Sequence, residues 1–413
     1  MTLYAFILGR KNLLSTAELC NVFSDEHHII DIQNETMIAS CERPLRRPQE
    51  SLDRLGGTMK IAEVFAEFPL TLENLASPVS AYLVETFQNQ SSKLTYGLSI
   101  YNFAQRNDPI IKKVLNRVKT DLNAAGIKSR FINKGFQNLK NAAIKGEKLV
   151  EKGAEILIIE GKHKLFFAKT VAVQDFESYS HRDYDRPARD AKLGMLPPKL
   201  AQIMINCGGY THLSKATPKG ITLYDPFAGI GTVLTEGLLL EYNVVGSDIS
   251  QKVLDGAQEN LFWTYQNDRS IQRTSRLFQK DATSISKKDC PEEINLIITE
   301  SYLGPPVKKL PDKKQMKKNF QHIEETITRF FRAVHKVVKP KTPVIISFPI
   351  YRDKRTFHSI KSLPEKIEKL GYHIEPLIPR SVAAKFGVKA DESLIYDRPN
   401  QIVGREIWKF IRK

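Results

Sequence analysis

Short apolar runs alternate with amphipathic segments along this chain, and the alternation predicts a mixed α/β protein. Residues 1–72 are typical of a small α/β unit that opens with a strand at 3–8. A helix is expected near 15–24, with Ser15 as its N-cap and Glu18 three residues on as the partner in a capping box.

A second α/β unit is predicted for residues 73–175. It contains an apolar strand at 94–101 and a basic amphipathic helix at 109–125. A further helix is expected at 141–153, followed by two apolar strands. The polar segment 176–193 is interpreted as a linker between domains.

The most informative segment is 224–232, which reads Tyr-Asp-Pro-Phe-Ala-Gly-Ile-Gly-Thr. A buried strand ends at Asp225, two glycines follow, and a helix is expected to begin at Thr232. An α/β sheet builds its nucleotide-binding crevice from a strand, a tight glycine turn and a helix. The glycines let the backbone approach a ligand where a Cβ atom would clash. An ordinary turn in a plain βαβ unit is the alternative.

Two more acids follow predicted strands, which favours a bound adenosine over an ordinary turn. Asp248 is placed to hold a ribose diol, and Asp281 to reach an adenine amine. The third glycine of the dinucleotide fingerprint is missing, and Asp225 would repel a pyrophosphate but attract a cationic amino-acid tail. These features predict S-adenosylmethionine rather than NAD. The residues expected to hold it are Asp225, Phe227, Gly229, Gly231, Thr232, Asp248, Ile249, Asp281 and Ala282.

The net charge of the chain predicts a polyanionic partner. The 413 residues carry 62 Lys and Arg against 46 Asp and Glu, a net charge of +16, which favours nucleic acid as partner. Lysines concentrate at 308–318, where phosphate contact and a merely solvated helix start are both open. No apolar run approaches the length that spans a bilayer, so no membrane is expected. The four cysteines lack metal-ligand spacing, which predicts reduced thiols, no metal and a cytoplasmic location.

Three motifs together resemble those of the THUMP-domain RNA methyltransferases, and most closely the tRNA guanosine-N2 methyltransferases. They are Arg182-Asp183-Tyr184-x-Arg186-Pro187, Gly194-Met195-Leu196-Pro197-Pro198-Lys199-Leu200-Ala201 and Asp225-Pro226-Phe227-Ala228-Gly229-x-Gly231-Thr232. The resemblance implies a ferredoxin-like domain at 1–72, a THUMP RNA-binding domain at 73–175, a linker at 176–193 and a Rossmann-like class I methyltransferase domain at 194–413.

The resemblance also implies the partner and the reaction. Members of the family grip the acceptor stem and free 3′ end of tRNA, take a guanosine out of the helix and methylate its N2 amine with S-adenosylmethionine. Some members act alone and others need a small helper subunit, so a helper subunit stays open here.

One motif departs from the family pattern, at the loop nearest the chemistry. The family has Asp (or Asn)-Pro-Pro-Tyr after the fourth strand, whereas this chain has Glu300-Ser301-Tyr302, with its prolines displaced to Pro305 and Pro306. The expected catalytic residues are Glu300 as a side-chain acceptor for the amine protons, the carbonyl of Ser301 as a backbone acceptor, and Tyr302 as the ring that stacks on the base. Two alternatives remain: a tRNA-binding protein that has lost catalysis, and a DNA amino-methyltransferase.

Overall fold

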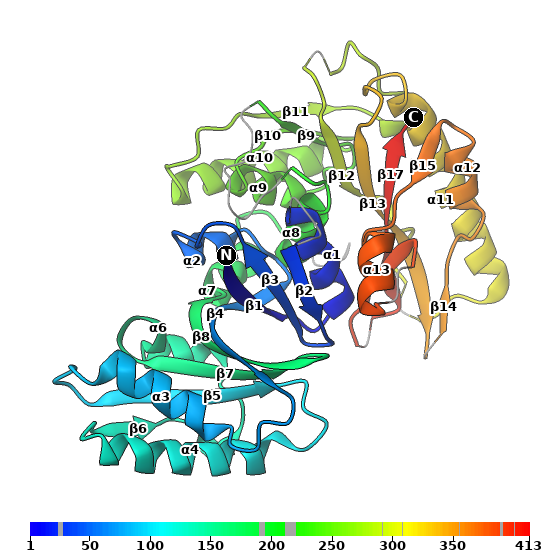
Figure 1. The fold of residues 1–413 in the computed structure, drawn as a ribbon. Coiled ribbons are helices and arrows are strands. Elements are labelled where there is room, and N and C mark those ends of the chain that lie inside the picture. Colours follow the sequence, from blue (N-terminus) through cyan, green and yellow to red (C-terminus); the bar gives the residue numbers. More distant parts are fainter. Residues whose placement is uncertain are drawn as a thin grey trace. The chain divides into compact units, whose positions relative to one another are not determined.

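The computed structural model describes residues 1–413 except 24–27, 190–194, 211–219, 291, 308, 355, 389–390 and 400. The chain forms two compact units (Figure 1). The first holds residues 1–15 and 25–175, and the second holds residues 16–24 and 176–413. Gly194, part of one quoted motif, lies outside the described residues.

A single eight-stranded sheet organises the first unit, in the order β2-β3-β1-β4-β8-β7-β5-β6. Strands from the predicted ferredoxin-like and THUMP segments join where β4 pairs with β8, so that division of residues 1–175 stays a prediction. The strands are β1 (Thr2–Leu8), β2 (Ile29–Ile32), β3 (Thr36–Cys41), β4 (Thr58–Pro69), β5 (Leu94–Tyr101), β6 (Ser129–Phe131), β7 (Ala154–Glu160) and β8 (Lys164–Val173).

Amphipathic helices complete this unit. In α4, Ile111, Leu115 and Val118 recur at helical spacing and bury their side chains beside those of α3 and the sheet. The helix expected at 141–153 is instead two short helices, because Lys148 takes a left-handed conformation with φ 53°. The helices of this unit are α2 (Pro48–Asp53), α3 (Ala76–Phe87), α4 (Asn107–Ala124), α5 (Asn141–Gly146), α6 (Leu149–Lys152) and the 3₁₀ turn η2 (Lys134–Phe136). Helix α1 (Asn12–Val22) begins in this unit, and its residues from Thr16 on belong to the second unit.

The predicted capping box of α1 is wrong. The helix begins at Asn12, so Ser15 lies inside it and donates its hydroxyl to the carbonyl of Gly57 at 2.8 Å. Glu18 is fully buried in the second unit, where it accepts a hydrogen bond from Asn206 Nδ2 at 2.6 Å. The Glu18 carboxylate therefore binds Asn206, which is distant in the sequence, and not the backbone at the start of α1.

The second unit is built on another sheet, with the order β11-β10-β9-β12-β13-β17-β15 and with β14 and β16 paired to β13 and β17. Strands β9 to β13 run parallel, and β17 runs antiparallel to β13. The strands are β9 (Thr222–Asp225), β10 (Asn243–Asp248), β11 (Ser275–Gln279), β12 (Leu296–Glu300), β13 (Pro343–Asp353), β14 (Thr356–His358), β15 (Tyr372–Ile374), β16 (Ser393–Tyr396) and β17 (Val403–Arg412).

The chain order reverses between β9 and β12, which places a binding crevice at their carboxyl ends. After β9 the chain adds β10 and β11 on one side, then returns to add β12 and β13 on the other. Asp225 ends β9 and Glu300 ends β12, so the fold brings two residues 75 positions apart to one edge of the sheet.

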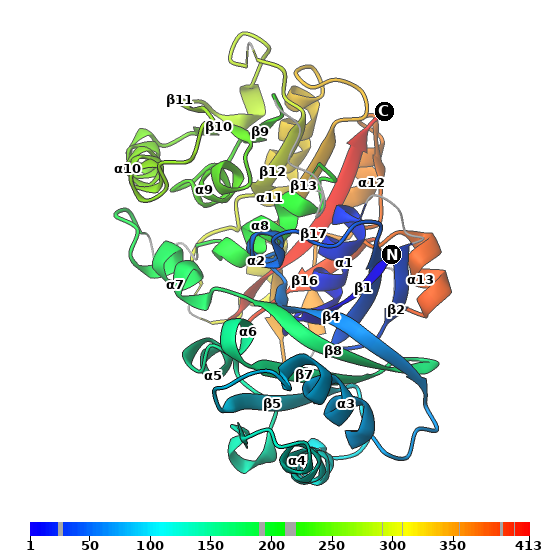
Figure 2. The same ribbon diagram turned by 60° about the vertical axis from the view of Figure 1, so that its left-hand side comes forward.

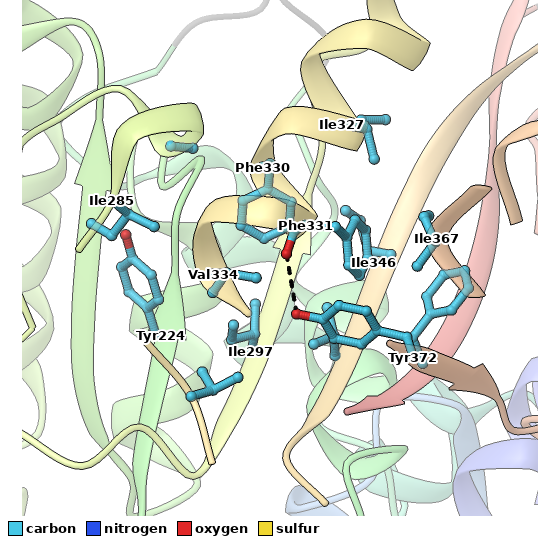
Figure 3. Close-up of a cluster of buried hydrophobic side chains, with 14 of the residues drawn as sticks. Tyr224, Ile285, Ile297, Ile327, Phe330, Phe331, Val334, Ile346, Ile367 and Tyr372 are labelled. Atoms are coloured by element: carbon cyan, nitrogen blue, oxygen red, sulfur yellow. Dashed lines mark hydrogen bonds between the residues drawn. The ribbon is translucent and has the colours of Figure 1, made fainter. Parts of the chain in front are cut away.

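Helices cover both faces of this sheet (Figure 2). On one face α11 and α12 pack a core onto β9, β12 and β13, where Tyr372 donates its hydroxyl to the carbonyl of Phe331 at 3.3 Å (Figure 3). On the other face, Leu234 of α9 packs so closely on Gly246 that a Cβ there would lie 2.5 Å from its Cδ1 atom. The helices are α7 (Phe176–Tyr184), α8 (Pro198–Asn206), α9 (Thr232–Leu239), α10 (Gln251–Asn267), α11 (Lys313–Val334), α12 (Leu363–Glu368), α13 (Arg380–Phe386) and the 3₁₀ turn η3 (Ala282–Ser284).

Candidate active site at the ends of β9 and β12

The glycine turn after β9 has the conformation that its sequence requires. Gly229 and Gly231 have φ values of 52° and 81°, in the left-handed region that favours glycine. Gly229 donates its amide to Asp248 Oδ2 at 3.1 Å, which ties the turn to the end of β10. Helix α9 begins at Thr232, as predicted. The turn therefore leaves backbone and small side chains where a ligand would lie.

Asp225 is a buried acid with a perturbed pKa. Its Oδ1 atom accepts hydrogen bonds from the Thr299 hydroxyl at 2.6 Å and the Phe227 amide at 3.1 Å, and the residue is only 2% exposed. Burial raises the pKa of Asp225 to about 7, and the nearby acids Asp248 and Glu300 add to the rise. A cationic ligand group beside Asp225 would stabilise the ionised carboxylate against the effect of burial. The site therefore fits the ammonium of an amino-acid tail.

The two other strand-end acids lie as the sequence predicted but are less enclosed. Asp248 also accepts the Ser250 amide at 3.0 Å through Oδ1. The neighbouring Ile249 side chain is 67% exposed, so an apolar surface is free to cover an adenine ring. Asp281 caps η3 by accepting the Thr283 amide at 2.8 Å, and Ala282 next to it is buried. Each carboxylate keeps lone pairs that a ribose or adenine donor can use.

A cavity of about 130 Å³ joins the glycine turn to the end of β12. It brings together four of the predicted cofactor residues and one predicted catalytic residue. Gly231, Asp248, Ile249, Asp281 and Ala282 do not line it. The cavity lies beside Asp225, where the prediction places the methionine end of the cofactor. The lining residues are Met195, Leu196, Asp225, Phe227, Ala228, Gly229, Ile230, Thr232, Val233, Val253 and Glu300.

Glu300 is held by Arg405, for which the sequence favoured a structural role over one at the site and indicated no pairing with Glu300. Arg405 of β17 donates through Nε to Glu300 Oε1, and through Nη2 to the Met195 carbonyl at 3.4 Å. Burial raises the pKa of Glu300, and the Arg405 guanidinium opposes that rise. No local signal identifies this pair, because the two residues are 105 positions apart and meet only across the sheet.

Ser301 and Tyr302 do not line the cavity with Glu300. The Ser301 hydroxyl and amide both donate to the carbonyl of Ser347 on β13, at 2.8 and 3.1 Å. The Tyr302 side chain is 42% exposed, and its ring meets the His322 ring edge-on with centroids 6.1 Å apart. Tyr302 is therefore accessible for stacking on a base, and the roles of both residues stay predictions.

The segment predicted as a linker is partly helical and supports the site within the second unit. Arg182 of α7 pairs with the buried Glu236 of α9 at 2.7 Å. Arg186 donates from Nη1 to the Thr232 hydroxyl at 2.7 Å, while its buried Nε atom has no hydrogen-bond partner among the described residues. Asn260 of α10 holds the turn by donating to the Ile230 carbonyl at 2.8 Å.

A cationic surface lies at the start of α11, in the chain segment that follows the Glu300 loop. The side chains of Lys313, Lys314, Lys317 and Lys318 are exposed, and none forms an ion pair within the described part of the chain. Lys308 of the predicted run lies outside the described residues. We call these four lysines the α11 lysine surface.

The second unit has the Rossmann-like α/β fold of class I methyltransferases and is preceded in the chain by another α/β unit, which confirms the predicted fold class. S-adenosylmethionine is the cofactor of this class, and the residues around Asp225 fit its cationic methionine end. Among the described residues, no cluster of His, Cys, Asp or Glu suits a metal ion, and no helix has the length and apolar character to cross a membrane.

Comparisons with known proteins agree with the resemblance stated above. The chain is similar in fold to the crystal structure of TrmN from Thermus thermophilus, with a TM-score of 0.53, 12% identity, and coverage of 100% of this chain and 99% of that one. It is 38% identical over 68 residues to the tRNA (guanine(10)-N2)-dimethyltransferase of Methanothermobacter thermautotrophicus. That match spans 16% of this chain and 18% of the relative. No family model matches the chain.

Proposed function

We propose that this protein transfers a methyl group from S-adenosylmethionine to the exocyclic N2 amine of a guanosine in tRNA. The observation that carries the proposal is a pair of carboxylates, the buried Asp225 and the partly buried Glu300, that line one cavity at the reversal of strand order. Asp225 suits the ammonium of the methyl donor, and Glu300 suits the amine of the acceptor. The 68-residue match to a guanine-N2 dimethyltransferase supports the same reaction.

The chemistry assigns Glu300 a role in exposing the amine lone pair. S-adenosylmethionine supplies an electrophilic methyl group. The lone pair of the guanine N2 atom is delocalised into the ring, so a group that accepts hydrogen bonds from the amine protons favours the tetrahedral geometry of attack. Glu300 would accept such a bond and take up the proton that the nitrogen releases on methylation.

An ionised Glu300 also favours guanine over the other amino bases. The Watson–Crick edge of guanine presents the N1 hydrogen and the N2 amine as adjacent donors, and a carboxylate accepts from both. Adenine and cytosine present an acceptor nitrogen beside the amine, and a carboxylate repels its lone pair. Guanosine in tRNA is therefore favoured over the DNA amine substrates that the sequence left open.

The α11 lysine surface supports an RNA substrate. Its four lysines occupy the first turns of a helix, where they repel one another and face the positive end of the helix dipole. The arrangement disfavours the isolated helix, and RNA phosphates would offset the repulsion. Tyr302, with its exposed ring, precedes this helix in the chain and suits stacking on a base outside its duplex.

The proposal is tested by methyl transfer to tRNA. Purified protein with methyl-labelled S-adenosylmethionine and bulk tRNA should give N2-methylguanosine or N2,N2-dimethylguanosine, identified by mass spectrometry of the nucleosides. Asp225→Ala is the negative control, and duplex DNA serves as the competing substrate. If several tRNA pools show no methyl transfer above the level of the Asp225→Ala control, the proposal is rejected.

A non-catalytic tRNA-binding protein is the second candidate function. The observation that favours it is the engagement of the Glu300 carboxylate by Arg405 and of Ser301 by the Ser347 carbonyl. Complementation in cells separates the two functions. If the Glu300→Ala variant rescues a deletion strain as fully as the wild-type protein does, and tRNA methylation is absent, binding alone is the function.

A further inference from the structure

We infer that Arg405 is a positioning residue for methyl transfer: it fixes the Glu300 carboxylate at the cavity as an acceptor-only group for the base. The inference rests on the proposed function and extends it to a residue outside the catalytic loop and the cofactor motifs.

The sheet register explains how Arg405 reaches Glu300. Arg405 lies opposite Pro349 on β13, and Glu300 lies opposite Ser347 on the other side of β13. The Arg405 side chain therefore reaches across β13, which lies between β17 and β12, to meet Glu300 at the end of β12. Because Arg405 is only 4% exposed, the guanidinium is held in a fixed orientation.

The contacts of Arg405 leave part of the glutamate available. Its Nε atom bonds Glu300 Oε1, and its Nη2 atom bonds the carbonyl of Met195, which also lines the cavity. Within the described residues, Glu300 Oε2 has no hydrogen-bond partner. The second oxygen is therefore the atom we assign to the amine of the base, with the side chain fixed by the first.

The charges around Glu300 show why it needs the arginine. The titratable groups that face it are Asp225, which is another buried acid, and Arg405, which is the cation. Burial favours the protonated acid, and Arg405 opposes that effect. A protonated Glu300 would present a donor to the amine instead of an acceptor. Without the arginine, Glu300 would therefore be protonated in a larger share of the protein molecules at neutral pH, and those molecules could not accept the amine hydrogen bond.

Kinetics of Arg405→Gln and Arg405→Lys test this role. Arg405→Gln should lower kcat by roughly 100-fold and leave the KM for S-adenosylmethionine within a few-fold, because the acceptor and not the cofactor loses its orientation. Its activity should recover at higher pH, so that the pH–rate curve moves to higher pH than wild type. Arg405→Lys keeps the charge and should restore the pH–rate curve with only part of kcat.

A matched control is Arg412→Gln. Arg412 lies on the same strand and donates to the Val338 carbonyl, at the end of the sheet opposite the cavity. This variant should keep the wild-type pH–rate curve. A uniform loss of activity in Arg405→Gln with no movement of the curve would assign Arg405 a structural role and overturn the inference.

A second measurement does not need activity. The Glu300 carboxyl carbon is followed by NMR in protein labelled with ¹³C in glutamate, and its signal is identified by its absence from Glu300→Gln. We expect the signal to titrate at higher pH in Arg405→Gln than in wild type, and unchanged titration overturns the inference. If wild type methylates no tRNA, the proposed function fails, and this titration still decides whether Arg405 keeps Glu300 ionised.

Discussion

At the scale of single residues, the buried acids set the behaviour of the site. Asp225 is enclosed by its own strand end, the turn after it and the Thr299 hydroxyl. In the free protein it gains and loses its proton near neutral pH. A residue that the sequence identifies only as an acid at a strand end thus becomes a group whose charge depends on its ligand.

This predicts that cofactor affinity rises with pH. The folded-state pKa of Asp225 is raised to about 7, so the acid is mostly protonated at lower pH and ionised above it. The cationic cofactor prefers the ionised form, so its Kd should fall by up to about 10-fold per unit as pH rises toward 7, then level off. Calorimetric titration across this range measures the effect.

The control for this experiment is an acid remote from the cavity. Asp225→Asn should bind the cofactor weakly, with little dependence on pH. Asp289→Asn should behave as wild type, because Asp289 pairs with Lys280 and Ser286 and does not line the cavity. A wild-type Kd that stays constant across the range would contradict the expected role of Asp225.

The glycine turn gives a second prediction at this scale. Gly231→Ala forces an L side chain into the left-handed region and places its Cβ 3.3 Å from Ala257 Cβ. We expect cofactor affinity to fall by about 10-fold or more, with a loss of stability of about 1 kcal/mol. Gly209→Ala is the matched control, since its φ of 82° is nearly the same and a Cβ there meets no atom of the described residues within 4 Å.

Cofactor binding separates the two glycine variants. Gly209→Ala should lose similar stability, measured by urea unfolding, and bind S-adenosylmethionine as wild type does. Equal losses of affinity in the two variants would mean that backbone strain, and not the shape of the turn, explains the effect.

At the scale of elements, α11 combines a packing face with a cationic one. Its Ile323, Ile327 and Phe331 side chains join the core of the sheet, while the α11 lysine surface faces solvent. Asp312 caps the helix by accepting the Gln315 amide at 2.8 Å, which offsets part of the repulsion between the lysines. The core contacts and the N-cap thus stabilise a helix whose exposed face is cationic.

Replacing Lys313, Lys314, Lys317 and Lys318 by Gln should weaken tRNA binding and reduce its salt dependence. Each lost phosphate contact lowers the slope of log K against log salt by about 0.7 to 0.9. Filter binding at several salt concentrations measures both. The control changes four exposed lysines elsewhere in the unit, Lys287, Lys288, Lys336 and Lys361. If both variants reduce the slope equally, total charge and not this surface determines binding.

At the scale of the whole molecule, the two compact units hold different kinds of buried charge. In the second unit, Asp225 and Glu300 face a cavity. In the first, Glu155 is fully buried and accepts hydrogen bonds from Lys60, Ser99 and Thr170 at 2.6 to 2.7 Å. These partners come from β4, β5 and β8, so the network joins the strands of the eight-stranded sheet.

Lys60→Met should therefore destabilise the first unit specifically. It leaves the buried Glu155 charge without its cation, which costs about 3 to 5 kcal/mol. Hydrogen exchange followed by mass spectrometry should show lost protection in 58–69 and 154–173. Protection of 222–236 by S-adenosylmethionine should persist. The double variant Lys60→Met, Glu155→Leu should recover much of the stability, and its failure to do so would contradict the pairing.

The sequence by itself determined the features that depend on local patterns. Apolar periodicity predicted most strands and helices, including β5 and α4. A helix or strand that buries one face repeats its apolar residues at the period of that element. Two glycines and an acid after a strand predicted the cofactor turn, since few other residues adopt that backbone. The acids at 225, 248 and 281 followed from the same logic.

Only the tertiary structure decided which distant residues meet. Ser15 and Glu18 fit a capping box locally, yet Gly57 and Asn206 bind them in the fold. Arg405 reaches Glu300 because the antiparallel last strand lies beside β13, and no spacing in the chain encodes that approach. Charge–charge contacts depend on distances in space, so the sequence supplies the acids and the fold decides their partners.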